Sequence, residues 1–322
     1  MFTNNTTDFT ILQWNDYLKI TAYSLLLTIG CFMNFVSFIY FGFKTQRMKS
    51  NYRYFIAHLS FADLLCCLMV PTMTIIEIIN NGDWVFGKLA CTYFYPIGRL
   101  TGVNSAWILC GMTYERYRTF TNPFKPLRKR TTQIYLALTW FITVSVSLSF
   151  SLSSVKLHDN KCFMQGKSVN ASFLNIMKTH MKITLPCCVM VVLCVRLKTF
   201  LVKENRRRKK NLNAKLRTDK SEKVVLYSVI SYLVCVLPTL IGATTVNVKN
   251  IVKSKTTFAE HKETMTWILI LFYSNNVVNV FIYAGRFKDF RKYIFSWIGC
   301  GRRKKNIAEN FGRRSHEQST EF

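Results

Sequence analysis

The chain contains 322 residues, of which half are hydrophobic and 15% aromatic, and its 44 Lys and Arg outnumber 16 Asp and Glu to give a net charge of +28. This apolar content excludes an intrinsically disordered chain, and 11 cysteines, most of them within apolar runs, do not suit a secreted disulfide-rich scaffold. The basic residues lie in blocks between long apolar stretches, which favours a membrane protein over a nucleic-acid binder.

Seven apolar stretches are long enough to cross roughly 30 Å of hydrocarbon as helices. The third contains Pro96, Gly98 and Arg99, and the seventh contains one serine and three asparagines. Because polar groups in hydrocarbon are costly unless they face protein or water, we expect these two helices inside a bundle. The predicted spans are residues 18–43, 54–79, 91–118, 133–155, 173–201, 222–248 and 264–285.

The loop charges predict the orientation. Of the 44 Lys and Arg, 32 lie after spans one, three, five and seven, which places these segments in the cytosol and the N-terminus outside. The glycosylation sequons at Asn4, Asn5 and Asn170 all fall on the predicted outside. We therefore expect an extracellular tail over 1–17, a seven-helix domain over 18–285, and an amphipathic helix with a basic cytoplasmic tail over 286–322.

The expected location is the plasma membrane. Residues 1–16 are polar and show no cleavable signal peptide, so the first span is expected to act as its own insertion signal. We interpret the basic run 206–210 as a cytoplasmic segment that contacts anionic lipid of the inner leaflet. Nucleic acid is therefore not an expected partner.

Short motifs mark nearly every span. They are, in chain order, Asp63 within residues 59–64, Cys91 placed 25 residues before Arg116, Glu115-Arg116-Tyr117, Trp140, Pro186, Pro238, Asn279-Val280-Phe281-Ile282-Tyr283 and the amphipathic segment 287–293. This ordered set resembles the rhodopsin-like G-protein-coupled receptors over residues 18 to 298. In addition, Trp84-Val85-Phe86-Gly87 in the first outer loop resembles a motif common in their peptide receptors.

The resemblance implies an all-α membrane protein, a seven-transmembrane helix bundle with a short amphipathic eighth helix. It implies a receptor that activates a heterotrimeric G protein, and not an enzyme. The residues expected to serve coupling are Glu115, Arg116, Tyr117, Pro123 and Tyr283. Arrestin is a further expected partner if the tail, with Ser315, Ser319 and Thr320, is phosphorylated.

Asp63 is an acid deep within the second span, where an unpaired carboxylate would be costly. The resemblance supplies a polar network around it that binds a sodium ion in the family; a water-filled network without the ion is the alternative. No other cofactor is expected. The predicted members of this network are Asn34, Asp63, Ser105, Asn275 and Asn279.

The cysteines divide by location. Cys91 and Cys162 are the two cysteines expected on the oxidising side of the membrane, so we expect one disulfide between them. Eight others lie within spans and are expected to pack as small hydrophobic residues. Cys300 follows the amphipathic segment and is a candidate for palmitoylation, with a plain free thiol as the alternative.

Four positions depart from the family pattern. Val236 replaces the span-six tryptophan, Val280 replaces the span-seven proline, and Cys194 replaces the span-five tyrosine. Thr218 stands where many relatives carry an acid that pairs with the arginine. These changes leave three alternatives open, namely high basal activity, weak signalling, or a non-signalling decoy of the same fold.

Two positions exclude ligand classes by comparison with the family. Amine receptors carry an Asp where this chain has Gly98, and retinal-binding opsins need a Lys where it has Tyr273. A transporter is not favoured, since no internal repeat is visible.

The ligand pocket is predicted to be cationic. Arg99, Lys178 and Lys182 would favour an anionic group if they face it, and Glu77 could pair with one of them. The alternative is that the long side chains reach the lipid head groups instead. We expect a peptide ligand first, and a small anionic metabolite or lipid second. The predicted pocket residues are Glu77, Gly98, Arg99, Lys178, Lys182 and Tyr273.

Overall fold

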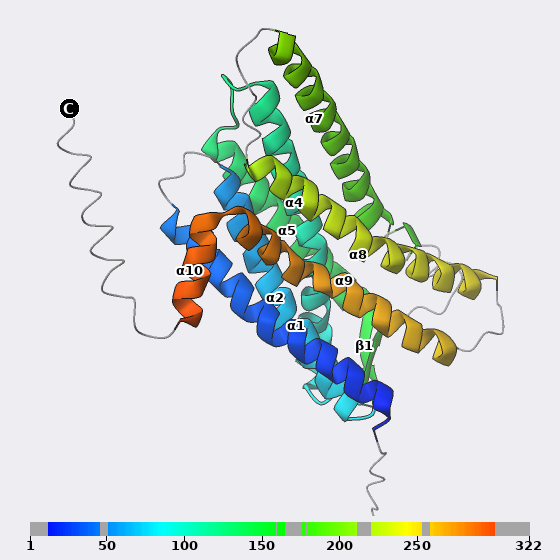
Figure 1. Ribbon diagram of the computed structural model, residues 1–322. Helices are drawn as coiled ribbons and strands as arrows, with labels where there is room; N and C mark the ends of the chain where they lie inside the picture. The colour runs from blue at the N-terminus through cyan, green and yellow to red at the C-terminus, as the bar shows by residue number, and fades with distance from the viewer. Residues whose placement is uncertain are drawn as a thin grey trace, which may run out of the picture.

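The computed structural model describes residues 12–45, 51–158, 160–164, 176–177, 180–210, 220–252 and 258–299. Seven long helices form one bundle in this part of the chain (Figure 1). They are α1 (Trp14–Ile39), α2 (Tyr52–Ile79), α4 (Tyr95–Thr121), α5 (Lys129–Ser154), α7 (Leu185–Lys210), α8 (Lys220–Ile251) and α9 (Phe258–Arg286). The fold is the predicted seven-helix bundle.

Shorter elements extend or connect these helices. The described parts contain three π-helical turns, the one-turn helix α3, a hairpin and a final short helix. They are η1 (Tyr40–Lys44), α3 (Gly87–Leu89), η2 (Ala90–Phe94), β1 (Val155–His158), β2 (Lys161–Met164), η3 (His180–Thr184) and α10 (Lys288–Ile298). We call the two ends of the bundle the Cys91 end and the Arg116 end, after residues near the two ends of the third span.

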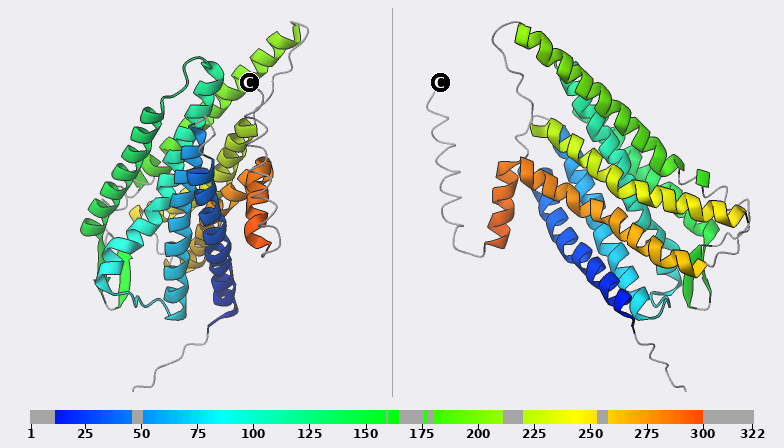
Figure 2. Two further views of the ribbon diagram at one scale, coloured as in Figure 1. Left: turned by 90° about the vertical axis from the view of Figure 1, so that its left-hand side faces the viewer. Right: turned by 45° about the vertical axis from the view of Figure 1, so that its right-hand side comes forward.

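Several helices extend beyond the predicted spans. The fifth was expected to end near residue 201, but α7 continues to Lys210 and projects past the neighbouring end of α8 (Figure 2). The sixth and seventh are also longer, because α8 begins at Lys220 and α9 at Phe258. Hydropathy reports where hydrocarbon ends, whereas helical hydrogen bonding continues through Lys, Arg and Glu, which are good helix formers. Residues 173–175 and 178–179 of the fifth span lie outside the described residues.

By length and apolar composition, five stretches within the described residues could each cross a membrane. They are Trp14–Lys44, Tyr52–Ile79, Lys182–Glu204, Lys223–Lys249 and Glu263–Arg286. The fourth helix, α5, is not among them, and serine occupies six of its last ten positions. The third, α4, was expected to be the least apolar, and its buried polar residues agree with an interior position: Thr101, Asn104, Ser105 and Thr113.

Two glycines allow close helix packing. A Cβ atom at Gly30 of α1 would lie 2.6 Å from Sγ of Cys67 on α2. A Cβ atom at Gly111 of α4 would lie 2.6 Å from a ring carbon of Phe55 on α2, and closer still to the ring of Tyr135 on α5. Any larger side chain at these positions would force the helices apart.

The hairpin is tied to the Cys91 end of the bundle. Strands β1 and β2 pair antiparallel, with Val155 opposite Met164 and His158 opposite Lys161. A disulfide joins Cys162 of β2 to Cys91 at the start of the third span, with the two Cα atoms 5.7 Å apart. Trp84 is buried against Cys91, so the first outer connection and the hairpin pack together.

Helix α10 turns away from α9 at Phe287 (Figure 1). Its buried residues, Phe290 and Ile294, are four apart and share one face, while Lys288, Arg291 and Lys292 are exposed. It is therefore the amphipathic eighth helix that the sequence predicts.

Candidate functional site

The Arg116 end of α4 carries a buried ion pair. The Arg116 side chain is 3% exposed and that of Glu115 4%, and their Nε and Oε2 atoms are 2.7 Å apart. The guanidinium carbon of Arg116 also lies 4.1 Å from the ring centroid of Tyr52, the first residue of α2. Burying two charges is costly, and mutual pairing offsets part of that cost.

The other residues expected to serve coupling lie at the same end. Tyr283 is fully buried on α9, with its ring edge-on to Phe41 at 6.0 Å. Tyr117 is half-buried, and Pro123 is exposed in the connection that follows α4. Its neighbour Phe124 is 97% exposed.

The network around Asp63 is smaller than predicted. The Asp63 carboxylate is fully buried and accepts hydrogen bonds from the Ser105 hydroxyl at 2.7 Å and the Asn279 amide at 3.2 Å. Asn34 instead donates to the backbone carbonyls of Gly30 and Asn276, each at 3.0 Å.

Asn275 likewise bonds elsewhere, since its side-chain oxygen accepts from Ser231 of α8 at 3.5 Å. Of the expected direct partners of the carboxylate, Asn275 therefore makes its hydrogen bond elsewhere, and Asn34, expected only nearby, also bonds to other groups. The reason is geometric: Asn275 shares α9 with Asn279 and Asn34 lies on α1, but the side chains of both point toward other partners. They brace α1 and α8 against α9 rather than bonding to Asp63.

The oxygen atoms near Asp63 fit a sodium ion. Besides the carboxylate and the Ser105 hydroxyl, Oδ1 of Asn279 is buried and makes no hydrogen bond within the described residues. Hard cations prefer such oxygen ligands. Within the same residues, no three His, Cys, Asp or Glu side chains come together as ligands for a metal ion.

The predicted ligand-pocket residues are spread over several elements. Glu77 and Lys182 are half-buried on α2 and η3, and Tyr273 is buried on α9 with its ring 5.1 Å from that of Phe272. Gly98 does not line an open space: a Cβ atom there would lie 3.2 Å from Cβ of Met69, so Gly98 packs against α2. The absence of a side chain at Gly98 therefore serves close packing of α4 against α2.

Several predicted site residues lie outside the described part of the chain. They are Asn4, Asn5, Asn170, Lys178, Thr218, Cys300 and the tail residues Ser315, Ser319 and Thr320. Arg99 lies on α4, but its side chain also falls outside what the structure describes.

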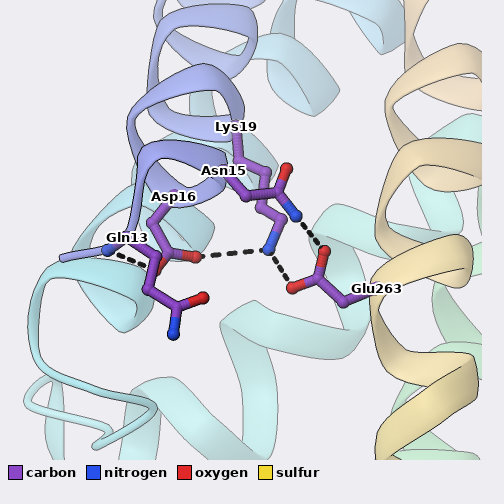
Figure 3. Close-up of polar contacts among 5 residues, drawn as sticks. All are labelled: Gln13, Asn15, Asp16, Lys19 and Glu263. Carbon is purple, nitrogen blue, oxygen red and sulfur yellow. Dashed lines mark hydrogen bonds and ion pairs between the residues drawn. The ribbon is translucent and has the colours of Figure 1, made fainter.

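A polar cluster at the Cys91 end was missed by sequence reasoning (Figure 3). The ammonium of Lys19 on α1 lies 3.2 Å from Oδ1 of Asp16 and 2.5 Å from Oε1 of Glu263 on α9. Asn15 donates to the other oxygen of Glu263. The cluster joins the ends of α1 and α9. A lysine three residues after an aspartate at the start of an apolar span was the available signal.

Most of the chain matches a known protein family. Residues 34–283 match the model of the 7 transmembrane receptor (rhodopsin family). The chain belongs to this family. Its members are receptors, so this protein is a multi-pass membrane receptor and not an enzyme.

The relatives include peptide receptors. The chain is 27% identical over 247 residues to the mouse (Mus musculus) neuropeptide Y receptor type 6, covering 69% of this chain and 65% of that receptor. It is 26% identical over 286 residues to the Drosophila melanogaster tachykinin-like peptides receptor 86C, covering 82% of this chain and 55% of that one. Melanopsin-A of Gadus morhua is 29% identical over 130 residues, 39% of this chain and 23% of the opsin. The match spans less than two thirds of the length of each of these relatives. Because two of them are named as peptide receptors, this chain is peptide-receptor-like.

Proposed function

We propose that this receptor senses an extracellular ligand, and that its Arg116 end faces the cytosol and activates a heterotrimeric G protein. One observation carries the proposal, the buried Glu115–Arg116 ion pair at the end of α4, with the exposed ring of Phe124 in the connection that follows. A buried arginine that is released from its ion pair can form charged hydrogen bonds with a partner. Phe124 would supply the apolar part of the same contact.

Activation requires Arg116 to become accessible. Outward movement of α8 relative to α4 would open the Arg116 end, and Tyr283 on α9 is placed to contact the released guanidinium. A ligand can drive this change only through higher affinity for the open state. We therefore place the ligand at the Cys91 end, under the disulfide-tethered hairpin.

We propose a peptide as the ligand. The printed names of the mouse and fly relatives, both receptors for peptides, support this class. Arg99, Lys178 and Lys182 favour an acidic group on the ligand. The alternative is a small anionic metabolite or lipid, which the same three cations would also attract.

Further roles are proposed for residues outside the coupling site. We propose a sodium ion at Asp63, glycans at Asn4, Asn5 and Asn170, and a palmitoyl group at Cys300. The plasma membrane is the proposed location, with anionic lipid against the basic segments and arrestin at the tail.

The test is basal and ligand-stimulated G-protein activation in cells, measured across the Gα classes, with Arg116→Ala at equal surface expression. We expect the wild-type signal to fall at least tenfold in the variant, since a buried charge contact is lost. A wild-type signal that Arg116→Ala leaves intact would contradict the proposed coupling site.

A non-signalling decoy is the second candidate. It is favoured by Val236 and Val280, which are buried in the core at positions where the family resemblance expects a tryptophan and a proline. A screen of acidic and neutral peptides for binding to intact cells separates the two functions. A peptide that binds at the surface without activating any Gα class would support the decoy.

A further inference from the structure

The ring of Tyr52 contacts the guanidinium of Arg116 from a neighbouring helix. Tyr52 begins α2 and is 1% exposed, and the Arg116 guanidinium lies over its ring at 4.1 Å. The face of an aromatic ring carries partial negative charge and attracts a cation, and the attraction is stronger where water is excluded. Both side chains are buried, so this contact is of the stronger kind.

The ring and the acid hold Arg116 in different ways. Glu115 is the neighbouring residue on α4, so the ion pair moves with Arg116 whenever α4 moves. Tyr52 belongs to α2 and therefore ties the arginine to a second helix. Only a partner on another helix can oppose a change in helix arrangement.

We propose that Tyr52 is a positioning residue that holds Arg116 in the resting orientation, and that Arg116 must leave this ring before it can contact a G protein. The inference rests on the proposed function, because it assigns a role to the same arginine. It adds a residue of α2 to the machinery that sets how much of the receptor is active without ligand.

Contacts of its neighbours anchor the start of α2, where Tyr52 lies. The Asn51 side chain, at the N-cap of α2, donates to the carbonyl of Leu127 at 2.5 Å and so anchors the start of α2 to the connection after α4. One turn later, Phe55 packs against the ring of Tyr135 on α5, with ring centroids 6.1 Å apart. Helix α2 is thus anchored on either side of Tyr52.

A second tyrosine offers a matched control. Tyr54, two residues further on, accepts a hydrogen bond from Arg53 at 2.7 Å and lies under that guanidinium at 4.3 Å. The ammonium of Lys129 lies 5.6 Å from the same ring. Tyr54 therefore makes the same type of contact on the same helix, with different cations.

The experiment compares Tyr52→Leu, Tyr52→Phe and Tyr54→Leu. One readout is basal G-protein activation per surface receptor. The other needs no G protein: the distance between spin labels carried by unnatural amino acids at Ile134 of α5 and Lys223 of α8 in the purified receptor. We expect Tyr52→Leu to raise the ratio of open to closed molecules by about 2- to 30-fold, the range expected from a ring–cation contact. Tyr52→Phe keeps the ring face and should stay within about twofold of wild type, as should Tyr54→Leu.

A fluorination series keeps the test valid if Tyr52→Leu does not fold. Phenylalanine with one, two or three ring fluorines at position 52 removes electron density from the ring face with little change in shape. The open fraction should rise stepwise with fluorine number, which loss of packing alone would not produce. A flat series, or a Tyr54→Leu effect equal to that of Tyr52→Leu, would overturn the inference.

The two readouts separate this inference from the proposed function. Spin-label distances that shift in the series without any G-protein signal would support the role of Tyr52 and contradict G-protein coupling. Distances that stay unchanged while Arg116→Ala abolishes signalling would contradict the role of Tyr52 alone.

Discussion

The carboxylate of Asp63 needs hydrogen-bond donors or a cation in place of water. It is fully buried, and each of its oxygens accepts one hydrogen bond, from Ser105 and from Asn279. A buried carboxylate keeps its charge only if such donors, or a cation, replace the lost water. The unpartnered Asn279 oxygen beside it favours the cation.

We predict that Asp63→Asn removes a stabilising effect of sodium. In the wild type, sodium at about ten times its dissociation constant should add about 1.4 kcal/mol to the free energy of unfolding. The measurement is thermal unfolding of the purified receptor in NaCl against choline chloride at equal ionic strength. Ser231→Ala, next to Asn275, is the control and should keep the sodium effect. An equal sodium effect in Asp63→Asn would rule out the site.

At the scale of helices, α4 is placed by contacts with α2 and α5. Gly111 is the point of closest approach, because a Cβ atom there would overlap the rings of Phe55 and Tyr135. The Tyr135 hydroxyl also donates to the backbone carbonyl of Trp107 at 2.6 Å, so this ring has little freedom to move aside. The same three helices carry Tyr52 and Arg116, and their separation determines whether the ring and the guanidinium meet.

We predict that Gly111→Ala destabilises the receptor. Overpacking costs about 1–3 kcal/mol, which exceeds the gain of about 1 kcal/mol from better helix propensity. Gly42 is a matched control, since a Cβ atom there meets nothing closer than 3.9 Å. Thermal unfolding should show a lower melting temperature than wild type for Gly111→Ala and no decrease for Gly42→Ala. Two variants with equal melting temperatures would mean that the ring of Tyr135 moves aside at little cost.

At the scale of the molecule, the charge distribution predicts the orientation in the membrane. Of the 44 Lys and Arg, 32 lie in the sequence segments that follow spans one, three, five and seven. We predict that an epitope at the N-terminus is stained on intact cells, whereas one at the C-terminus is stained only after permeabilisation. Enzymatic removal of N-glycans should lower the apparent mass, and by less in Asn170→Gln. C-terminal staining on intact cells would reverse the proposed topology.

The sequence by itself determined the number of helices, their order and the family, because hydropathy and motif spacing are local properties of the chain. It also predicted the ion pair of Arg116 with Glu115, the contact of Asp63 with Ser105 and Asn279, and the Cys91–Cys162 disulfide. It made several helices too short, since apolar composition marks the edge of hydrocarbon and not the limits of helical hydrogen bonding. It also could not tell which of four polar residues would reach Asp63.

Only the tertiary structure decided which side chains meet across helices. The ring of Tyr52 lies under Arg116, and Lys19 reaches Glu263, although these partners are far apart in sequence. Gly98 packs against Met69 of α2. Each of these contacts depends on how a helix is rotated about its axis and how closely it approaches its neighbour. Side-chain volumes from three or more helices set these quantities together, so no single stretch of sequence encodes them.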